Sequence, residues 1–477
     1  QVQQRNPRAQ HLPRLGWMGG ELENNGAVVT SDPARPELGL YLVADRPLAR
    51  GQLVIRDTPL LRVAGGAGRR RLPDEVSGKA AALRAAGLFV PTEKEGGGAS
   101  EGNIVLRRLR REAPRDESED GLFVRSVLHF NSFMAGVSGA DEVVFATLAR
   151  ANHACAPNCI VDGDEGTLRT VRDVPLGGML TISYLDEATL LLPRDRRRTE
   201  LSERWDFMCG CSRCAAAVDD TRRFQGCPSA GCGGDLLVEG GGGGGARPSP
   251  PQLRCAACGA TASPAERQRL LAAEEAAEAA LRKAQDGDME EEDEGQELMK
   301  CYKFASKHPR HAVSLELAHI FAFPDPLPAK RTLLAGLQAI LGDLPCQLAV
   351  DESRELADIL AKRGEKDEAQ ATLNAAAAMA SILDGVADPR QTLEQWAARR
   401  VSSSAAARLL PVPPAEQRPD LDLDLNTAQH PPDRGGSGKA TTEDEGSPSS
   451  AMLPQPEAPA TAAGAATEGG GPEGRQT

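Results

Sequence analysis

Three strings of residues carry most of the structural information in this chain. They are Asn152-His153-Ala154-Cys155-Ala156-Pro157-Asn158-Cys159, then Ile182-Ser183-Tyr184, and then Phe207-Met208-Cys209-Gly210-Cys211-Ser212-Arg213-Cys214. The last string contains the spacing CxCxxC, which is typical of metal thiolates. Zinc is held by four Cys or His ligands, so these three thiols need a fourth ligand from elsewhere in the chain.

The distribution of cysteines supports metal binding rather than disulfide bonding. The chain has 11 cysteines, an odd number, and none precedes Cys155. Disulfide scaffolds do not cluster in this way within a large chain. A second set with metal-ligand spacing is Cys227, Cys232, Cys255 and Cys258. A closed set of four thiolates favours a structural zinc ribbon, and the sequence therefore predicts two zinc ions and a reducing compartment.

Composition limits the broad class of protein. The chain has 477 residues, a formal charge of −13 and only 3% aromatic residues. The negative charge gives no strong signal for nucleic-acid binding, and no uncharged stretch is long enough for a membrane helix. Eight acids between Asp286 and Glu297 indicate a solvated linker, or otherwise a site for a basic partner such as a histone tail. The chain begins with Gln1, so targeting signals upstream cannot be read; we expect the nucleus or the cytoplasm.

Periodicity predicts an α+β architecture. Residues 39–61 read as two strands around a turn, residues 78–86 and 122–133 as helices, and residues 193–204 as a helix that leads into the cysteines. After Cys258 the pattern is helical to about Arg400, with Ser263 as an N-cap and a helical hairpin over 353–383 that resembles a solenoid. Residues 411–477 are rich in Pro, Gly, Ser and Ala, and we expect them to be disordered.

The order and separation of NHxCxPN, ISY and CxCxxC resemble the SET-domain protein lysine methyltransferases, and the cysteine-rich and helical segments resemble the SET and MYND subgroup. The resemblance covers roughly residues 37–400. It implies a SET domain 37–206 with an insert 64–120, a post-SET and four-cysteine region 207–260 and a helical domain 263–410. Composition adds an irregular segment 1–36 before them and the disordered tail 411–477 after them. The insert contains no cysteine, so we expect the MYND zinc finger to be absent.

The resemblance also implies residue roles. Asn131, Asn152 and His153 would bind S-adenosylmethionine, and Phe207 would pack on its adenine. Tyr184 would be the active-site tyrosine, and Trp205 would form one wall of the target-lysine channel. Cys155 would be the fourth ligand of the zinc held by Cys209, Cys211 and Cys214, which would leave Cys159 as a buried free thiol.

These features predict that the protein is a protein-lysine N-methyltransferase that acts on a histone or another protein. The alternative is a catalytically inactive SET-like scaffold that binds partners through its helical domain, and the altered cofactor strand Gly39-Leu40-Tyr41 favours it slightly. A plastid-type SET enzyme is disfavoured because that branch typically lacks the post-SET cysteines.

Two weaker motifs remain. The arginines of 194–198 read as a solvated helix face, rather than as a contact with acidic substrate or nucleic acid. In the tail, Leu421, Leu423 and Leu425 resemble the LxLxL corepressor-docking motif of plant transcriptional repressors.

Overall fold

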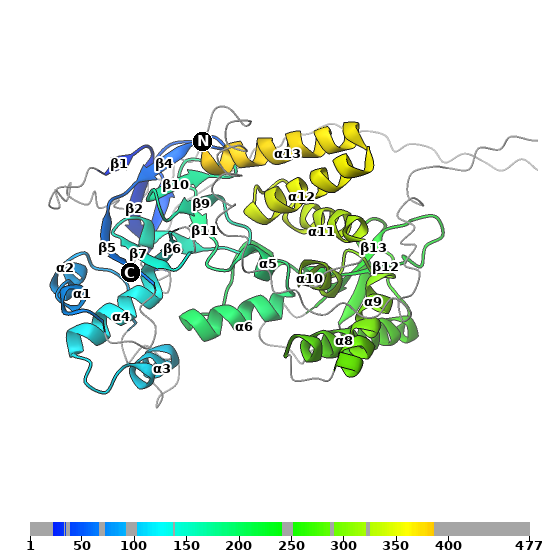
Figure 1. The fold of residues 1–477 in the computed structure, drawn as a ribbon, viewed down its shortest axis with the longest axis horizontal. Coiled ribbons are helices and arrows are strands. Elements are labelled where there is room, and N and C mark those ends of the chain that lie inside the picture. Colours follow the sequence, from blue (N-terminus) through cyan, green and yellow to red (C-terminus); the bar gives the residue numbers. More distant parts are fainter. Residues whose placement is uncertain are drawn as a thin grey trace, which may run out of the picture. The chain divides into compact units, whose positions relative to one another are not determined.

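A computed structural model describes residues 22–32, 34, 39–65, 72–91, 103–136, 139–240, 251–286, 291–320 and 325–385 (Figure 1). All of them belong to one of the two structural units of the chain, Gln1–Leu423. The tail 411–477, with Leu421, Leu423 and Leu425, lies outside the described residues. Among the helices that the structure describes, none combines the length and the apolar composition that crossing a membrane requires.

Small antiparallel sheets build the N-terminal half. One sheet has the order β1-β4-β10-β9, another β5-β7-β6, and a third pairs β2 with β3. The bounds are β1 Glu23–Asn24, β2 Ala27–Ser31, β3 Leu40–Ala44, β4 Leu53–Arg56, β5 Pro59–Val63, β6 Ser132–Ala135, β7 Asp141–Phe145, β9 Cys159–Asp162 and β10 Thr167–Thr170. Their apolar faces share one core, in which Leu42, Ile55 and Phe145 are fully buried. The two strands expected within 39–61 are present as β3 and β4.

The prediction of an irregular segment 1–36 is wrong for residues 23–31. These residues form β1 and β2, and β2 pairs with β3 in the register Ala27↔Ala44 to Ser31↔Leu40. The β-branched residues of Ala27-Val28-Val29-Thr30 fit a pleated strand, but the polar residues around them obscure so short a pattern.

In the described residues of the cysteine-free insert and of the segment after it, the main elements are helices. They contain α1 Asp74–Ser77, α2 Ala80–Ala85, α3 Ile104–Glu112 and α4 Glu119–Asn131, so α2 and α4 match the two helices expected there. The Ser118 hydroxyl caps α4 by accepting from the Gly121 N–H at 3.0 Å, and the acids Glu119 and Asp120 suit the positive end of the helix. Val124 and Val127 then bury one face of α4 against α1, α2 and the sheet.

The middle of the chain contains short helices and a cysteine-rich sheet. Its helices are η2 Leu148–Arg150, α5 Glu187–Leu190, α6 Arg194–Trp205 and α7 Ser212–Ala215. An antiparallel sheet follows, with β12 Val218–Gln225, β13 Asp235–Glu239 and β14 Gln252–Cys255. We call this sheet and its four cysteines, 227, 232, 255 and 258, the ribbon.

The C-terminal half of the described chain is helical, as expected. Its helices are α8 Pro264–Asp286, α9 Glu291–Ala305, α10 Ala312–Ile320, α11 Pro326–Leu341, α12 Gln347–Arg363 and α13 Lys366–Asp384. The expected hairpin is α12 and α13, and Gly364 makes the turn with a φ of 85°. The acidic stretch 286–297 is not only a linker: α9 begins at Glu291, because Glu is a good helix former.

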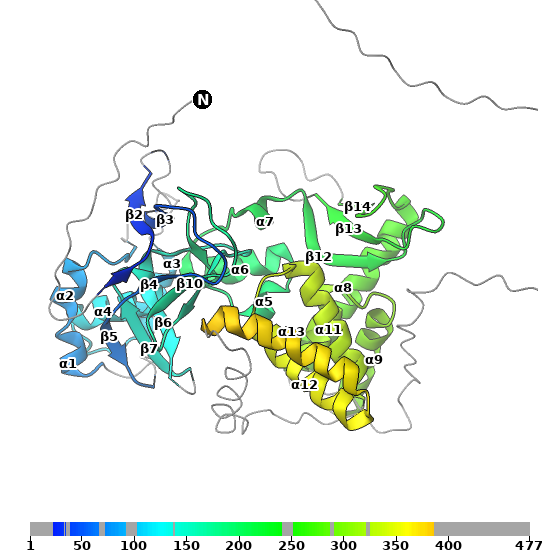
Figure 2. The same cartoon turned by 90° about the horizontal axis from the view of Figure 1, so that it is seen from above.

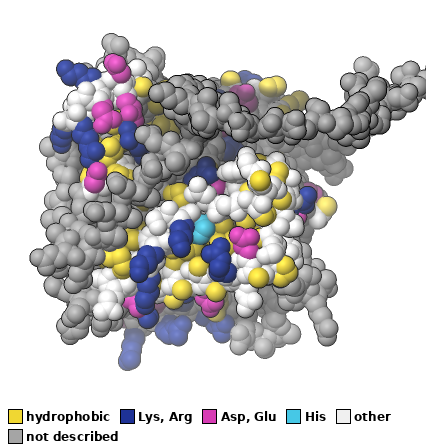
Figure 3. Space-filling view, turned by 90° about the vertical axis from the view of Figure 1, so that its right-hand side faces the viewer, with side chains coloured by type: hydrophobic (Ala, Val, Ile, Leu, Met, Phe, Trp, Pro, Cys, Tyr) yellow, Lys and Arg dark blue, Asp and Glu magenta, His cyan; other side chains and the backbone are white. Residues whose placement is uncertain are grey.

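The helices pack against both the ribbon and the rest of the N-terminal half (Figures 1 and 2). One apolar cluster joins Cys155, Leu185 and Leu201 to Leu333 and Leu337 of α11. Although the whole chain is acidic, Figure 3 shows a face on which Lys and Arg side chains gather around a histidine among apolar side chains.

Candidate active site and metal centres

Two short parallel strands bring the first two sequence strings together. They are β8 Asn152–His153 and β11 Thr181–Ile182, with the register Thr181↔Asn152 and Ile182↔His153. The Ala154 N–H donates to the Ile182 carbonyl at 2.9 Å and continues the pairing. Tyr184, two residues beyond β11, therefore lies next to His153.

Tyr184 is held at both its backbone and its hydroxyl. Its backbone N–H donates to His153 Nδ1 at 3.0 Å, and its hydroxyl donates to the Ala151 carbonyl at 3.0 Å. Burial raises the pKa of the Tyr184 hydroxyl and lowers the pKa of His153 to about 4. At neutral pH both groups are therefore uncharged, and His153 Nδ1 carries no proton, so it can accept the hydrogen bond from the Tyr184 N–H.

The aromatic ring of Phe207, from the third string, and that of Trp205, two residues before it, complete this site. The Trp205 ring centroid lies 5.4 Å from that of Tyr184, and the Phe207 ring lies edge-on to Tyr184 at 6.3 Å. His153 lies 6.1 Å from Phe207 and 5.4 Å from Tyr184. The structure thus gathers four of the residues singled out from the sequence; we call His153, Tyr184, Trp205 and Phe207 the aromatic cluster.

The remaining residues assigned to cofactor binding lie in different surroundings. Asn152 is in β8, beside His153. Asn131 is the last residue of α4 and is 5% exposed; its amide donates to the carbonyls of Phe89 at 2.7 Å and Val127 at 3.2 Å, so it ties α4 to the segment before α3. Gly39 has a φ of 59° at the start of β3, where Leu40 is exposed and Tyr41 is buried.

Asn158 is a residue whose role the sequence reasoning missed. Its amide donates to the Met179 carbonyl at 2.8 Å, and its Oδ1 accepts from the Thr181 N–H at 2.8 Å. It therefore fixes the segment that enters β11. The sequence feature that could have indicated this role is an Asn directly after Ala156-Pro157, because Asn side chains commonly bond to backbone groups.

The first cysteine quartet comes together as expected. The sulfurs of Cys155, Cys209, Cys211 and Cys214 all lie within 4.8 Å of one another. Zinc–sulfur bonds of about 2.3 Å in a tetrahedron place sulfurs roughly 3.8 Å apart, so this donor set fits a zinc ion. Cys159 lies outside the quartet; it is 1% exposed, and burial raises its pKa to about 12.

The arginines of α6 correct one sequence interpretation. Arg194 and Arg197 are 3% and 1% exposed, so the stretch 194–198 is not a solvated face. Arg197 Nη2 lies 3.9 Å from Cys214 Sγ, and Arg198 donates to the carbonyls of Cys209 and Cys214 at 3.0 and 3.1 Å. Positive guanidinium groups beside several thiolates offset the negative charge that such a quartet concentrates.

The second quartet closes the ribbon. The sulfurs of Cys227, Cys232, Cys255 and Cys258 also lie within 4.8 Å of one another. Gly234 is required beside them, because a Cβ there would stand 2.7 Å from Cys255 Sγ. Four thiolates occupy every position of a tetrahedral zinc, so the site suits a structural ion rather than a catalytic one.

A buried charged network fastens the ribbon to the helices. Arg222 of β12 binds the Glu274 carboxylate of α8 through two nitrogens, and His311 Nε2 lies 3.1 Å from Glu274 Oε1. Burial alone would raise the pKa of Glu274, but hydrogen bonds from Arg222 and His311 outweigh it and hold that pKa at about 2. Phe224 packs beside this network, with its ring centroid 4.9 Å from that of His311.

Comparison with known proteins found relatives that match part of this chain. No family model matches the chain. The histone-lysine N-methyltransferase SMYD3 of Homo sapiens is 35% identical over 101 residues, which are 20% of this chain and 23% of that protein. SET5 of Scheffersomyces stipitis, also named a histone-lysine N-methyltransferase, is 36% identical over 94 residues, 18% of this chain and 19% of the relative. The N-lysine methyltransferase SMYD2-A of Xenopus laevis is 30% identical over 91 residues, 19% of this chain and 20% of the relative.

These matches span about a fifth of the length of the curated relatives. The chain is thus related to the SET-domain lysine methyltransferases. Within that class it is related to the SMYD subgroup.

Proposed function

We propose that this chain is an S-adenosylmethionine-dependent protein-lysine N-methyltransferase. The observation that carries the proposal is the position of Tyr184, which two short strands hold between His153 and the Trp205 ring. A tyrosine on a half-buried strand is usually ordinary packing. Here its neighbours are the side chains to which the resemblance assigns contacts with the methyl donor and the target lysine.

The roles of the residues follow from the chemistry of methyl transfer. S-adenosylmethionine supplies a methyl group on a positively charged sulfur; Asn131, Asn152 and His153 would bind it, with Phe207 against the adenine. Trp205 would line the channel that admits the target lysine. In methyl transfer the lysine nitrogen would attack the methyl carbon, and the electron pair of the C–S bond would leave with sulfur.

The attacking amine must be neutral, while a free lysine has a pKa of about 10.4. An apolar channel lowers that pKa because burial disfavours the charged form. The proton therefore leaves to solvent before transfer, and no strong base is required. The Tyr184 hydroxyl and nearby backbone carbonyls orient the amine and stabilise the positive charge around the methyl group.

Zinc would hold parts of the chain together and take no part in methyl transfer itself. Cys155, Cys209, Cys211 and Cys214 would hold one ion, and this ion would pin the segment that carries Trp205 and Phe207 to the strand that carries His153. The other four cysteines would hold the second ion in the ribbon. The substrate is a protein, either a histone or another protein, and we expect a reducing compartment.

The test is methyl transfer from labelled S-adenosylmethionine to core histones and, separately, to proteins of a cell lysate. We expect label on lysine side chains. A chain that binds the methyl donor but labels no protein would contradict the proposal and favour the scaffold.

A matched pair of cysteine variants tests the link between zinc and the site. Cys155→Ser should weaken binding of the methyl donor, because its zinc joins the two parts of the pocket. Cys258→Ser removes an exposed ligand of the ribbon and should leave that binding unchanged. Equal effects of the two variants would argue against a role for the first zinc in completing the pocket.

A further inference from the structure

A left-handed turn separates Trp205 from Phe207. It is Asp206, the residue that ends α6, with φ 58° and ψ 39°. Among the described residues other than glycine, Asp206 alone has a positive φ. This left-handed conformation costs most L-residues energy, and Asp and Asn adopt it more readily than the others because their short polar side chains bond locally. The directions of the Trp205 and Phe207 side chains both depend on this turn.

Asn103, about a hundred residues earlier, binds Asp206. Asn103 is 4% exposed, and its Nδ2 donates to Asp206 Oδ2 at 2.7 Å. Its Oδ1 accepts from the Leu106 N–H at 2.9 Å, which makes Asn103 the N-cap of α3. One amide therefore starts a helix of the insert and fixes the turn at the end of α6.

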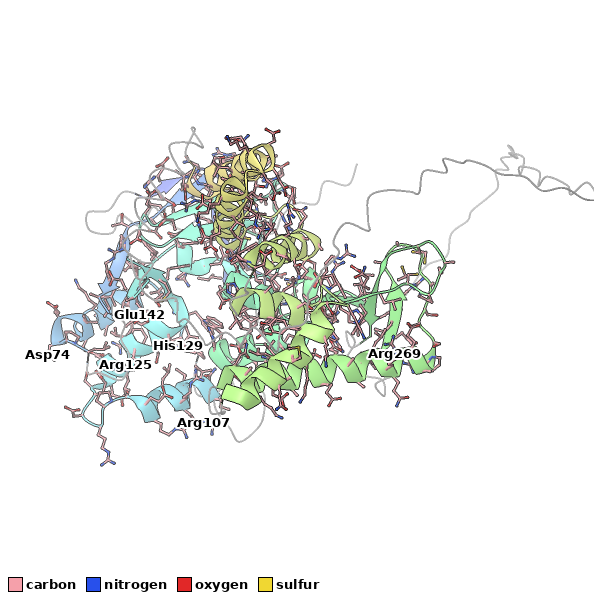
Figure 4. The ribbon with its side chains drawn as sticks, turned by 45° about the vertical axis from the view of Figure 1, so that its right-hand side comes forward. Asp74, Arg107, Arg125, His129, Glu142 and Arg269 are labelled. Atoms are coloured by element: carbon pink, nitrogen blue, oxygen red, sulfur yellow. The ribbon has the colours of Figure 1, made fainter. Side chains whose placement is uncertain are left out.

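A second contact from the same side secures the residue before Trp205. His129 Nε2 lies 2.6 Å from the Arg204 carbonyl, and since a carbonyl only accepts, His129 donates. Figure 4 shows His129 on α4 and Arg107 on α3, the two helices from which these contacts come. Both neighbours of Trp205 are thus bound: the side chain of Asp206 by the insert, and the backbone carbonyl of Arg204 by α4.

We propose that Asn103 is a positioning residue for the active site: through Asp206 it sets the orientation of Trp205 and Phe207. This proposal rests on the proposed function for the roles of those two rings. It gives the cysteine-free insert a task in catalysis, because Asn103, which binds the turn at Asp206, belongs to that insert.

The chemistry of Asn103 makes the proposal specific. Asp and Ser cap helices about as well as Asn, so capping alone does not require an amide. An ionised Asp has no proton to donate, whereas the Asn amide accepts from the Leu106 N–H through Oδ1 and donates to the Asp206 carboxylate through Nδ2. Asn103→Asp would keep the cap of α3 but set two carboxylates against each other at hydrogen-bond distance.

The decisive comparison is between Asn103→Asp and the exchanged pair Asn103→Asp with Asp206→Asn. In the exchanged pair the amide now at position 206 can donate to the carboxylate now at position 103, and Asn tolerates the left-handed conformation. Ser263→Asp is the control: Ser263 caps α8, where it accepts from the Glu266 N–H at 3.2 Å, and it is exposed.

Two measurements distinguish an effect of Asn103 on the orientation of Trp205 from a general effect on the stability of the fold. The first is the emission of Trp205 in a background where Trp17 and Trp396 are changed to Phe. The second is kcat and KM for a lysine peptide, at a temperature where circular dichroism shows every variant folded. We expect Asn103→Asp to shift the Trp205 emission and to lower kcat/KM by about tenfold or more, and the exchanged pair to restore both.

The proposal is overturned if Asn103→Asp leaves Trp205 emission unchanged, or if the exchanged pair is as impaired as the single variant. It is also overturned if Ser263→Asp has the same effect as Asn103→Asp. Failure of the proposed function shows differently: the parent chain then transfers no methyl group, while the emission of Trp205 still decides whether Asn103 sets its orientation.

Discussion

Tyr184 takes its backbone partner from 31 positions earlier in the chain and its hydroxyl partner from 33 positions earlier. Both partners belong to the segment 151–153, so the tyrosine and the histidine form one unit. The Ala151 carbonyl also keeps the Tyr184 hydroxyl in a fixed direction. A hydroxyl with a fixed direction is the kind of preorganised dipole that stabilises developing charge in a transition state.

Tyr184→Phe removes this hydroxyl and keeps the ring. We expect methyl transfer to fall by at least about a hundredfold, the scale for the loss of one preorganised polar group. Binding of the methyl donor, measured by calorimetry, should persist because the rings of His153 and Phe207 remain. Phe133→Leu, which packs on the same sheet core as Tyr184 but is not one of the four rings of the aromatic cluster, serves as a control for nonspecific loss of packing. Transfer by Tyr184→Phe at the wild-type rate would mean that Tyr184 is ordinary packing.

At this scale the sequence predicted residues inside motifs and missed residues defined by distant contacts. His153, Tyr184 and the two cysteine quartets could be read because their motifs have recognisable spacing. Asn103 could not, since its partner is 103 positions away. The arginines of α6 were misjudged for the same reason: a run of charge usually faces solvent, and only the folded thiols show why Arg197 is buried.

The ribbon depends on α8 and α10 as well as on its cysteines. Glu274 of α8 is 3% exposed and accepts from Arg222 of β12 and from His311 at the start of α10. Removing one member of a buried charged network leaves the others without partners, which is costly. The network therefore joins three elements that are separate in sequence.

Acid should weaken this junction. The pKa of Glu274 is held at about 2, below its ordinary value of 4.5, so the folded state favours the ionised carboxylate. Its contribution to stability is then complete above pH 4.5 and is lost as the pH falls toward 2. Glu274→Gln should be less stable than the parent at pH 7, and this difference should shrink by about 2 kcal/mol by pH 3.

Urea unfolding followed by circular dichroism at the two pH values gives this difference. Acid also protonates zinc-bound thiols, but that effect is common to both chains and cancels in the comparison. Glu275→Gln, at the exposed neighbouring position, is the control. A difference between Glu274→Gln and the parent that stays constant with pH would show that Glu274 is not the group responsible.

Element length decided which elements could be predicted. Long helices such as α12 and α13 repeat their apolar residues over several turns, so their hairpin was visible in the sequence. The strands β8 and β11 have two residues each, too few for any period. Yet the pairing of β8 with β11 positions the site. These two strands could be located from the NHxCxPN and ISY motifs, although their hydrophobic periodicity gave no indication of them.

At the scale of the whole chain, Glu187 connects the two halves. Its carboxylate accepts from the backbone N–H groups of Gln347, at 2.7 Å, and of Leu348, the first residues of α12. Arg50 and Arg172 add contacts to Asp343 and to the Leu341 carbonyl. The fold class and the helical C-terminal half could be predicted from the sequence, but these contacts between the halves could not, because nothing in a local pattern marks them.

Glu187→Ala should destabilise the chain by about 1–2 kcal/mol, since it leaves the start of α12 without its cap. Glu187→Gln retains an amide oxygen that can accept and should lose less. Thermal unfolding of the three chains checks this order. Equal melting temperatures for Glu187→Ala and the parent would show that α12 does not need this carboxylate.

The two quartets predict both a number of ions and an order of release. Metal analysis should find two zinc ions per chain, one for each quartet. Cys258 is exposed, whereas Cys155, Cys209 and Cys214 are buried, so a chelator should strip the ribbon first. The early phase of release should disappear in Cys258→Ser. A single phase in the parent chain would contradict this order.

The contact between Glu187 and α12 has a consequence for synthesis on the ribosome. Its two partners, Gln347 and Leu348, follow Glu187 by 160 and 161 positions in the chain. At roughly 5–20 residues per second, translation needs about 10–30 seconds to produce Gln347 after Glu187. During that interval the apolar surface around Leu185 and Leu201, which α11 covers in the finished chain, stays open in the nascent polypeptide. Cellular chaperones therefore have a defined time window in which to bind it.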